Sequence, residues 1–278
     1  MRTIVLGGGV IGVTTAYYLA REGHEVVVAD RAEAVGTDAT GGNAGLIAPG
    51  HSFAWASPAA PRMLLASLRG EATAIRVKPR LDARLIPWGL QFLRECTQPR
   101  AVANTLIKLA LCRYSQGQLD ELAAAEGIEY EQVQRGNVYL YRTPDALAAG
   151  VRKLELLRSQ GVPMNVLDPA QLAELDPAFS AAAGSFAGAI HVTTDASGDS
   201  ALFTQALADR AKALGVRFDL GVTARRLVSD GEQITGVVTS QGELRGDAYV
   251  LALGVASPFL SRTAGQRLPI YPAKGYSL

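Results

Sequence analysis

The chain of 278 residues is long enough for one large domain or two ordinary ones with a buried core. Apolar residues make up 48% of it and charged residues 19%, proportions that are typical of a globular protein and exclude wholesale disorder. The 27 Lys and Arg residues are balanced by 26 Asp and Glu residues, and this balance argues against nucleic acid as the main partner.

Cysteine, hydropathy and histidine patterns narrow the class further. Cys96 and Cys112 form neither a disulfide framework nor a zinc motif, which favours a reducing compartment. No apolar run reaches the ~20 residues of a membrane span. The apolar N-terminus is interrupted by glycines, as is typical of mature structure and not of a signal peptide. We therefore expect a soluble, cytoplasmic protein. Metal-ligand spacing is lacking at the three histidines, so no metal site is predicted at His24, His51 and His191.

The first elements form a strand–helix–strand unit. Apolar runs at 4–6 and 26–28 predict strands, and residues 10–21 between them predict a helix. Both strands are apolar on both faces, as buried strands of a parallel sheet are. Residues 34–60 are rich in Gly, Ala, Ser, Thr and Pro and predict a long functional loop.

The middle of the chain changes from helical to mixed. Residues 61–126 predict helices with breaks at Pro79 and Pro87, and residues 130–141 predict a β-hairpin rich in tyrosine. A capping residue followed by proline is a helix start signal. Such signals stand at Thr143-Pro144 and Asp168-Pro169.

From residue 187 onwards the first pattern returns. Asp199 predicts the cap of a helix at 201–214, which a strand at 216–220 follows. Residues 227–239 predict a hairpin, and the apolar run at 249–253 predicts a further strand. An α/β segment at each end of the chain therefore encloses a mixed α+β insertion.

Gly7, Gly9 and Gly12 match the dinucleotide-binding pattern G-x-G-x-x-G. They follow a predicted strand, open a helix and are answered by Asp30 at the end of the next strand, which is the context that the fingerprint requires. Gly7 allows the tight turn, Gly9 lets the backbone approach a pyrophosphate, and Gly12 lets the helix pack close to the strand. The Asp30 carboxylate can bind ribose hydroxyls and would repel a 2′-phosphate. This favours FAD or NAD over NADP.

The residues that follow the fingerprint favour FAD. Arg31, the loop with Asn43-Ala44-Gly45 and the final stretch Tyr271-Pro272-Ala273-Lys274-Gly275-Tyr276 resemble the D-amino-acid oxidase superfamily of flavoproteins. The resemblance is closest to the small subunit of the bacterial D-amino acid dehydrogenases. It implies a Rossmann-like FAD-binding domain from residues 1–84 and 191–278, with a mixed α+β substrate domain at 85–190 inserted between them.

The resemblance also implies a set of FAD contacts. The pyrophosphate is expected at Gly7, Gly9, Val10, Ile11 and Gly12. The adenosine ribose is expected at Asp30 and the adenine near Arg31, with a backbone contact at Ala224. The path from the pyrophosphate to the flavin ring is expected along Thr40, Asn43, Ala44, Gly45 and Leu46. The chain is expected to pass under the phosphates at Ala252 and Gly254.

The sequence departs from the family pattern at His51 and at Gly41-Gly42. The family also continues beyond the motif around Lys274. We therefore expect Tyr271 to Leu278 to begin a further strand, and the portion that closes over the flavin to be missing.

The activity that the resemblance implies is oxidation of an amino acid, a D-amino acid above all. Hydride would pass from Cα to flavin N5, and the imine would hydrolyse to a 2-oxo acid and ammonia. Only one dinucleotide fingerprint is present, so electrons are expected to go to a quinone or another acceptor; no catalytic residue is identified. Two alternatives stay open. One is an FAD-binding subunit or truncated fragment without independent catalysis, completed by a partner subunit, and the other is an oxygen-using oxidase of glycine or secondary amines.

Two further segments each have two open interpretations. Trp55, the apolar residues within 63–68 and the basic segment 69–84 either contact an anionic membrane surface, such as the inner face of the plasma membrane, or form a buried amphipathic face. The hairpin tyrosines either contact substrate or belong to the core, and they are Tyr130, Tyr139 and Tyr141.

Overall fold

The computed structural model describes residues 1–71 and 82–275, and the chain divides into two compact units. The first unit comprises residues 1–45, 122–131 and 199–278, and the second comprises residues 46–121 and 132–198. This division differs from the predicted bounds in three places. Residues 191–198, which were predicted in the FAD-binding domain, fall in the second unit. Residues 46–84 fall in the second unit, where Leu46 pairs with Ser197. Residues 122–131 fall in the first unit, where the Glu126 carboxylate accepts a 2.5 Å hydrogen bond from Tyr17.

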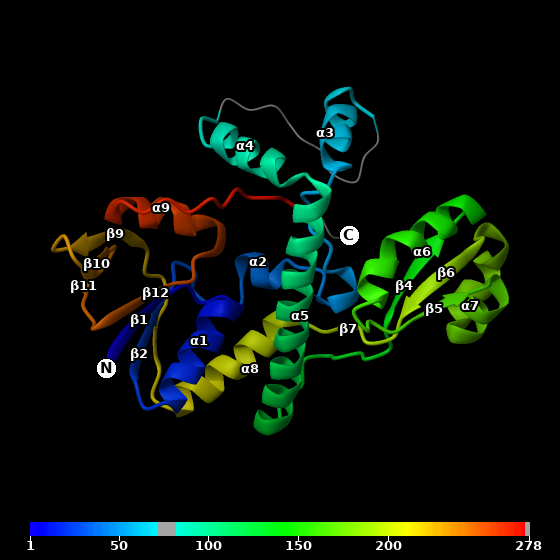
Figure 1. Cartoon of the computed structure of the whole chain (residues 1–278). Helices are drawn as coiled ribbons and strands as arrows, with labels where there is room; N and C mark the ends of the chain where they lie inside the picture. The colour runs from blue at the N-terminus through cyan, green and yellow to red at the C-terminus, as the bar shows by residue number, and fades with distance from the viewer. Residues whose placement is uncertain (72–81, 276–278) are drawn as a thin grey trace. The chain divides into compact units, whose positions relative to one another are not determined.

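A parallel sheet in the order β12-β1-β2-β8 forms the centre of the first unit (Figure 1). Its strands are β1 (Arg2–Leu6), β2 (Glu25–Ala29), β8 (Arg217–Asp219) and β12 (Ala248–Leu251). Helices α1 (Val10–Arg21) and α8 (Ser200–Ala213) lie side by side against it. The last three residues of β1 are apolar and at most 1% exposed, so this strand is buried on both faces. The predicted α/β class is confirmed.

A second, antiparallel sheet in the order β11-β10-β9 packs on the first unit's core. It is formed by β9 (Ala224–Ser229), β10 (Ile234–Thr239) and β11 (Gly242–Leu244), so the predicted hairpin is confirmed. Buried residues of both sheets share one hydrophobic cluster, which contains Ile4, Val27 and Val237. The unit also contains the short helices α2 (Asp38–Gly41), η3 (Gly254–Ala256), α9 (Ser257–Ser261) and η4 (Arg262–Ala264).

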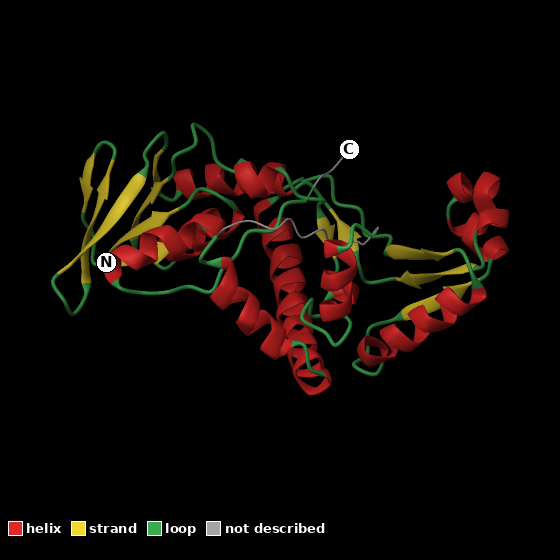
Figure 2. Ribbon diagram, turned by 90° about the horizontal axis from the view of Figure 1, so that it is seen from above, coloured by secondary structure: helices red, strands yellow, loops and turns green. Residues whose placement is uncertain are grey.

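The second unit contains an antiparallel sheet in the order β4-β6-β5, with helices on both sides of it at the right of Figure 2. Its elements are β4 (Asn137–Tyr141), α6 (Pro144–Arg158), β5 (Met164–Leu167), α7 (Pro169–Leu175), η2 (Pro177–Ser185) and β6 (Gly188–Val192). The Thr143 hydroxyl caps α6, and Asp168 and Gln171 form a capping box at α7. Both predicted helix starts are therefore confirmed.

The remaining elements of the second unit are short strands and helices. A two-stranded pairing joins β3 (Leu46–Ile47) to β7 (Ala196–Ser197), and the turn η1 (Pro49–His51) follows β3. The helices are α3 (Ala60–Leu68), α4 (Leu85–Glu95) and α5 (Gln98–Glu126), whose last residues belong to the first unit. Within residues 1–71 and 82–275, no helix combines the length and the apolar character that crossing a membrane requires.

Three predictions of local structure are wrong. The hairpin at 130–141 does not form, because β4 pairs with β6 and residues 130–133 contribute only an isolated bridge from Val133 to Ser197. Glu131 has a φ of +54°, which interrupts an extended strand. Pro87 does not break a helix, because it is the third residue of α4, where backbone N–H groups have no partner within the helix. Residues 271–275 form no strand, and Pro79 and residues 276–278 lie outside the described residues.

Candidate cofactor site

The glycine loop joins β1 to α1 in the first unit and is shaped by two backbone contacts. Gly7 has a φ of +119°, and a Cβ there would lie 2.4 Å from the carbonyl oxygen of Ala252. A Cβ at Gly12 would lie 1.8 Å from the carbonyl oxygen of Gly7. Both distances are shorter than any real Cβ contact, so only glycine allows β12, the loop and α1 to approach one another this closely.

Neither of these two close contacts involves Gly9. It precedes α1 with a φ of −77°, which any residue can adopt. Among the described residues, one atom lies within 4 Å of a Cβ built at Gly9, and it is Thr40 Oγ1 at 3.1 Å. Ile11 in the first turn of α1 is 68% exposed, so this helix end is accessible. The small residue therefore leaves space at a helix N-terminus, which fits a pyrophosphate.

Asp30, at the end of β2, holds the glycine loop and the neighbouring chain. Its Oδ2 accepts a 2.6 Å hydrogen bond from the N–H of Gly8, and its Oδ1 accepts a 2.7 Å bond from the N–H of Ala32. The backbone of Asp30 bonds on both sides of the turn after β8, to Asp219 at 3.1 Å and to Val222 at 2.8 Å. Each carboxylate oxygen retains a second lone pair for a ribose hydroxyl. The bond to Gly8 is a function that sequence reasoning missed.

Arg31 directly follows this acid and forms an ion pair with Asp38. The distance from Arg31 Nη2 to Asp38 Oδ2 is 2.7 Å, and both side chains are about two-thirds exposed. The hydrogen bond and charge of Asp38 raise the pKa of the Arg31 guanidinium. Arg31 therefore stays a cation with an exposed side chain, next to Asp30 in the sequence.

Residues 40–45 span the end of α2 and the turn that follows it, and they are called the 40–45 loop. This loop is folded around the side chain of Asn43. Its Nδ2 donates to the carbonyl oxygen of Thr40 at 2.6 Å, and its Oδ1 accepts from the N–H of Gly45 at 2.6 Å. Asn43 and Ala44 are exposed. The Thr40 hydroxyl accepts a 3.1 Å bond from the N–H of Val10, so this loop contacts the start of α1 directly. Leu46, the last residue predicted in this set, opens β3 and belongs to the second unit.

The other predicted residues lie at strand ends of the first unit. Ala224 begins β9 opposite Thr239. Ala252 follows β12, and its N–H donates to the carbonyl oxygen of Leu6 at 2.8 Å. Gly254 has a φ of +52° and is exposed. The glycine loop, Asp30, the 40–45 loop and Ala252 are thus brought together, while contacts of all these residues with FAD stay predictions.

A separate polar cluster surrounds His51 in the second unit. The His51 ring stacks on Tyr139, and its Nδ1 lies 2.8 Å from the Tyr139 hydroxyl. Burial and then the charges of Lys153 and Lys108 lower the pKa of His51. Burial also raises the pKa of Tyr139 to about 12, so both groups are neutral at pH 7. Their contact with a substrate stays a prediction.

The three tyrosines of the predicted hairpin have different surroundings. Tyr130 is 3% exposed and packs edge-on against Phe203, so it is part of the first unit's core. Tyr141 packs on the second unit's core cluster, together with Tyr139. The Tyr139 hydroxyl lies 2.8 Å from Nδ1 of His51, which is an exposed polar residue.

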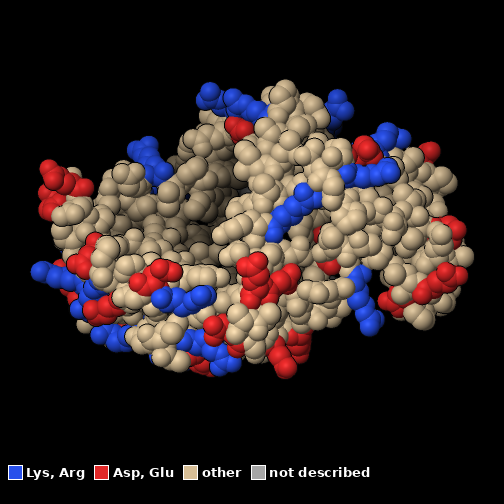
Figure 3. Space-filling model, turned by 60° about the horizontal axis from the view of Figure 1, so that its bottom comes forward, with Lys and Arg blue, Asp and Glu red and all other residues tan. Residues whose placement is uncertain are grey.

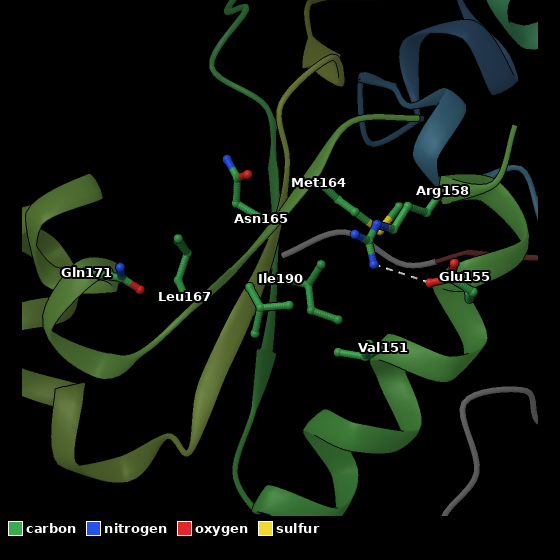
Figure 4. A pocket seen from close by; sticks show the side chains of 9 residues that line it. Val151, Glu155, Arg158, Met164, Asn165, Leu167, Gln171 and Ile190 are labelled. Carbon is green, nitrogen blue, oxygen red and sulfur yellow. Dashed lines mark hydrogen bonds and ion pairs between the residues drawn. The ribbon is translucent and has the colours of Figure 1, made fainter. Parts of the chain in front are cut away.

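A shallow hollow lies between α6 and the edge strand β5 of the second unit (Figure 4). Three of the polar side chains that line it have partners within the chain. Arg158 forms a 3.5 Å ion pair with Glu155, and Gln171 accepts a hydrogen bond from the backbone of Asp168. On the face shown in Figure 3, positive and negative side chains alternate and neither sign forms a large patch of its own. Neither feature offers a second candidate site.

The segment considered for membrane contact is described only in part. Trp55 is 63% exposed and Leu68 56%, whereas Met63 and Leu64 are partly buried. Arg76, Lys78 and Arg80 lie outside the described residues. Contact with a membrane stays a prediction.

The chain is similar to known proteins over its whole length. The model of the family described as "DAO: FAD dependent oxidoreductase" matches residues 2–278. All of the chain is similar to proteins named D-amino acid dehydrogenase from Allorhizobium ampelinum, at 40% identity, and Cereibacter sphaeroides, at 41% identity. The chain covers 66% and 64% of these two proteins, about two thirds of the length of the curated relatives it matches.

Solved structures share the fold. Glycine oxidase from Geobacillus kaustophilus is 22% identical with a TM-score of 0.64, and the match covers 95% of this chain and 58% of that one. L-amino acid deaminase from Proteus vulgaris is 19% identical with a TM-score of 0.65, and the match covers 96% of this chain and 50% of that one. With its fingerprint built as a Rossmann loop and its match from residue 2 to residue 278, the chain belongs to the DAO family of FAD dependent oxidoreductases.

Proposed function

We propose that the chain binds FAD and takes part in the oxidative deamination of D-amino acids to 2-oxo acids and ammonia. The observation that carries the proposal is the glycine loop, in which Gly7 and Gly12 are fixed by packing while Gly9 leaves space at the N-terminus of α1. The whole-chain similarity to proteins named D-amino acid dehydrogenase supports the choice of substrate. Electrons would pass to a quinone or another acceptor.

FAD supplies the oxidant when it is bound, because its isoalloxazine ring accepts a hydride from the substrate Cα as the amine becomes an imine. The chain's own residues bind and orient it. The N–H groups at the start of α1 would bind the pyrophosphate, and the free lone pairs of Asp30 would bind the ribose. Asn43 would hold the 40–45 loop in shape through its side-chain hydrogen bonds to the backbone of Thr40 and Gly45.

The test begins with the cofactor and continues with the reaction. The purified chain should contain FAD, or bind it after removal, with little affinity for NADP. D-amino acids added without oxygen should then bleach the visible absorbance of the bound flavin, and a dye acceptor should restore it. L-amino acids and glycine are the comparison substrates, and peroxide formed in air would reveal an oxidase. A chain that binds no FAD contradicts the proposal, and bound flavin that no D-amino acid reduces contradicts its second half.

A further inference from the structure

Ser200, the first residue of α8, is joined to the 40–45 loop by two hydrogen bonds. Its hydroxyl donates to the carbonyl oxygen of Thr40 at 2.5 Å and also bonds with Asn43 Nδ2. Asn43 Nδ2 donates in turn to the same Thr40 carbonyl. These side chains lie far apart in the sequence, and neither the fingerprint nor the family resemblance identified Ser200.

Ser200 is itself held firmly. The Asp199 carboxylate caps α8 by accepting from the N–H groups of Ala201 at 2.7 Å and Leu202 at 2.9 Å. The hydroxyl of Thr204, a residue with no exposed surface, donates to the carbonyl oxygen of Ser200 at 2.7 Å. Helix α8 also packs along α1. A side chain on this support has a defined position from which to hold a loop.

The loop that Ser200 holds reaches the glycine loop. The Thr40 hydroxyl accepts from the N–H of Val10, and it is the atom that a Cβ at Gly9 would meet. A continuous path of hydrogen bonds therefore runs from Ser200 through Thr40 to the N-terminus of α1. A displacement of Thr40 would change the space above Gly9, where we expect the pyrophosphate.

We propose that Ser200 is a positioning residue for the cofactor, which keeps the 40–45 loop in its FAD-binding shape. The proposal rests on the proposed function, since it takes FAD as the ligand. A hydroxyl suits the role because it donates to Thr40 and accepts from Asn43 at the same time. Asn43 and Ala44 are exposed, so little apolar burial holds this loop without such bonds.

The experiment compares three variants of the whole chain. Ser200→Ala removes both bonds, Ser200→Thr keeps a hydroxyl, and Thr143→Ala removes a hydroxyl of similar kind that caps α6 in the second unit. We expect Ser200→Ala to weaken FAD binding about threefold to thirtyfold, the worth of one to two net hydrogen bonds. It should also change the visible circular dichroism of the bound flavin. Ser200→Thr should restore most of the affinity, and Thr143→Ala should leave it unchanged.

A loop-positioning role and a purely structural role give different results. The melting temperature of the FAD-free chain should stay close to wild type in Ser200→Ala, because the Asp199 cap remains. Asn43→Ala should weaken FAD binding as well, and combining it with Ser200→Ala should add little, since both act on one network. This second variant serves also if Ser200→Ala does not fold.

The outcomes separate this proposal from the proposed function. If wild type binds no FAD, the proposed function fails. If wild type binds FAD and Ser200→Ala binds it equally well with an unchanged spectrum, the positioning role is wrong and the proposed function stands. The positioning role is also wrong if the FAD-free Ser200→Ala chain melts at a clearly lower temperature than wild type and Ser200→Thr does not restore FAD affinity.

Discussion

The Asp30 carboxylate accepts a 2.6 Å hydrogen bond from the N–H of Gly8, and thereby ties the end of β2 to the middle of the glycine loop. A residue expected to bind ribose is therefore also a support of the loop expected to bind the pyrophosphate. A charged acceptor makes this bond stronger than one between neutral groups. The two parts of the fingerprint consequently depend on each other in the folded chain.

Replacing Asp30 should for this reason impair FAD binding in two ways. Asp30→Ala loses the ribose contact and both backbone bonds, and we expect FAD affinity to fall by about 1–3 kcal/mol or more. Asp30→Asn keeps one acceptor oxygen but presents an NH2 group to one of the N–H donors, so it should also bind FAD weakly. Titration of the FAD-free variants with FAD, followed by flavin fluorescence, measures this effect.

Asp247 provides the matched control for Asp30. Its Oδ2 accepts a 2.7 Å bond from the N–H of Arg2, at the beginning of β1. Asp247→Ala removes a carboxylate–backbone bond at the start of β1, the end of that strand away from the glycine loop, and so leaves the loop intact. It should keep the wild-type FAD affinity, and an equal loss in both variants would show that the Asp30 effect is one of general stability.

Gly9 and Gly12 should respond differently to substitution by alanine. At Gly12 the Cβ would lie 1.8 Å from a backbone oxygen, so Gly12→Ala should destabilise the folded chain by about 1–3 kcal/mol or more. At Gly9 the backbone accepts alanine and the neighbouring atom is a hydroxyl at 3.1 Å. Gly9→Ala should therefore melt near the wild-type temperature without FAD and bind FAD at least about tenfold more weakly, because the Cβ fills the pyrophosphate space. Thermal melts with and without FAD test both, and a Gly9→Ala chain with full affinity would place the phosphates elsewhere.

The sequence predicts those parts of the fold that depend on neighbouring residues. The strand–helix–strand unit is visible from Ile4 to Asp30 because its periods, glycines and final acid are all local. The caps Thr143 and Asp168 are visible for the same reason. The pairing of β4 is not, because its partner β6 lies beyond α6, β5 and α7 in the chain. Strand pairing over such distances depends on packing, which local patterns do not contain.

The candidate site shows the same division. Residue types at Gly7, Gly9, Gly12 and Asp30 predict a dinucleotide site from spacing alone. Ser200 could not be found in this way, since its contact with Thr40 exists only after α8 has packed. The one available signal was Asp199, which marks the helix start and hence the position where a neighbouring side chain faces a loop.

Protonation of His51 should destabilise the second unit. Burial and the charges of Lys153 and Lys108 lower its pKa from the ordinary value of 6.5, so the unfolded chain takes up a proton first as the pH falls. The stability that neutral His51 contributes is therefore fully present above pH 6.5, and it is lost as the pH falls below that value and through the lowered pKa of the folded chain. His51→Gln should unfold with less pH dependence between pH 7 and pH 5. The chain has three histidines, so the NMR signal of the His51 ring in the wild-type titration can be assigned as the one that is missing in His51→Gln.

A charge change at Lys153 tests the cause. Lys153→Gln removes a cation that disfavours protonated His51, so the pKa of His51 should rise towards its ordinary value. Added salt should reduce the effect. Lys212→Gln, which removes an exposed lysine paired with Asp209 in the first unit, should leave the titration unchanged. A histidine pKa that moves with neither Lys153 nor salt would mean that burial alone lowers it.

Asp195 offers the clearest separation between the charge of a side chain and its hydrogen bond. It is 1% exposed, and its Oδ1 accepts a 2.8 Å bond from the N–H of Gly50, the residue before His51. Burial raises its pKa above the ordinary value of 3.8, so folding favours the protonated form. The folded chain is therefore relatively more stable below pH 3.8 in this respect, and this contribution is lost as the pH rises through the raised pKa.

Asp195→Asn keeps an acceptor for Gly50 without the buried charge. It should be as stable as wild type or more so at pH 7, with a smaller difference at pH 4. Asp195→Ala leaves the buried Gly50 N–H without this acceptor and should cost about 1–3 kcal/mol at both pH values. Urea unfolding of the three proteins at pH 4 and pH 7 measures these differences. Equal destabilisation by asparagine and alanine at pH 7 would show that the negative charge itself, and not the acceptor oxygen, holds the turn at Gly50.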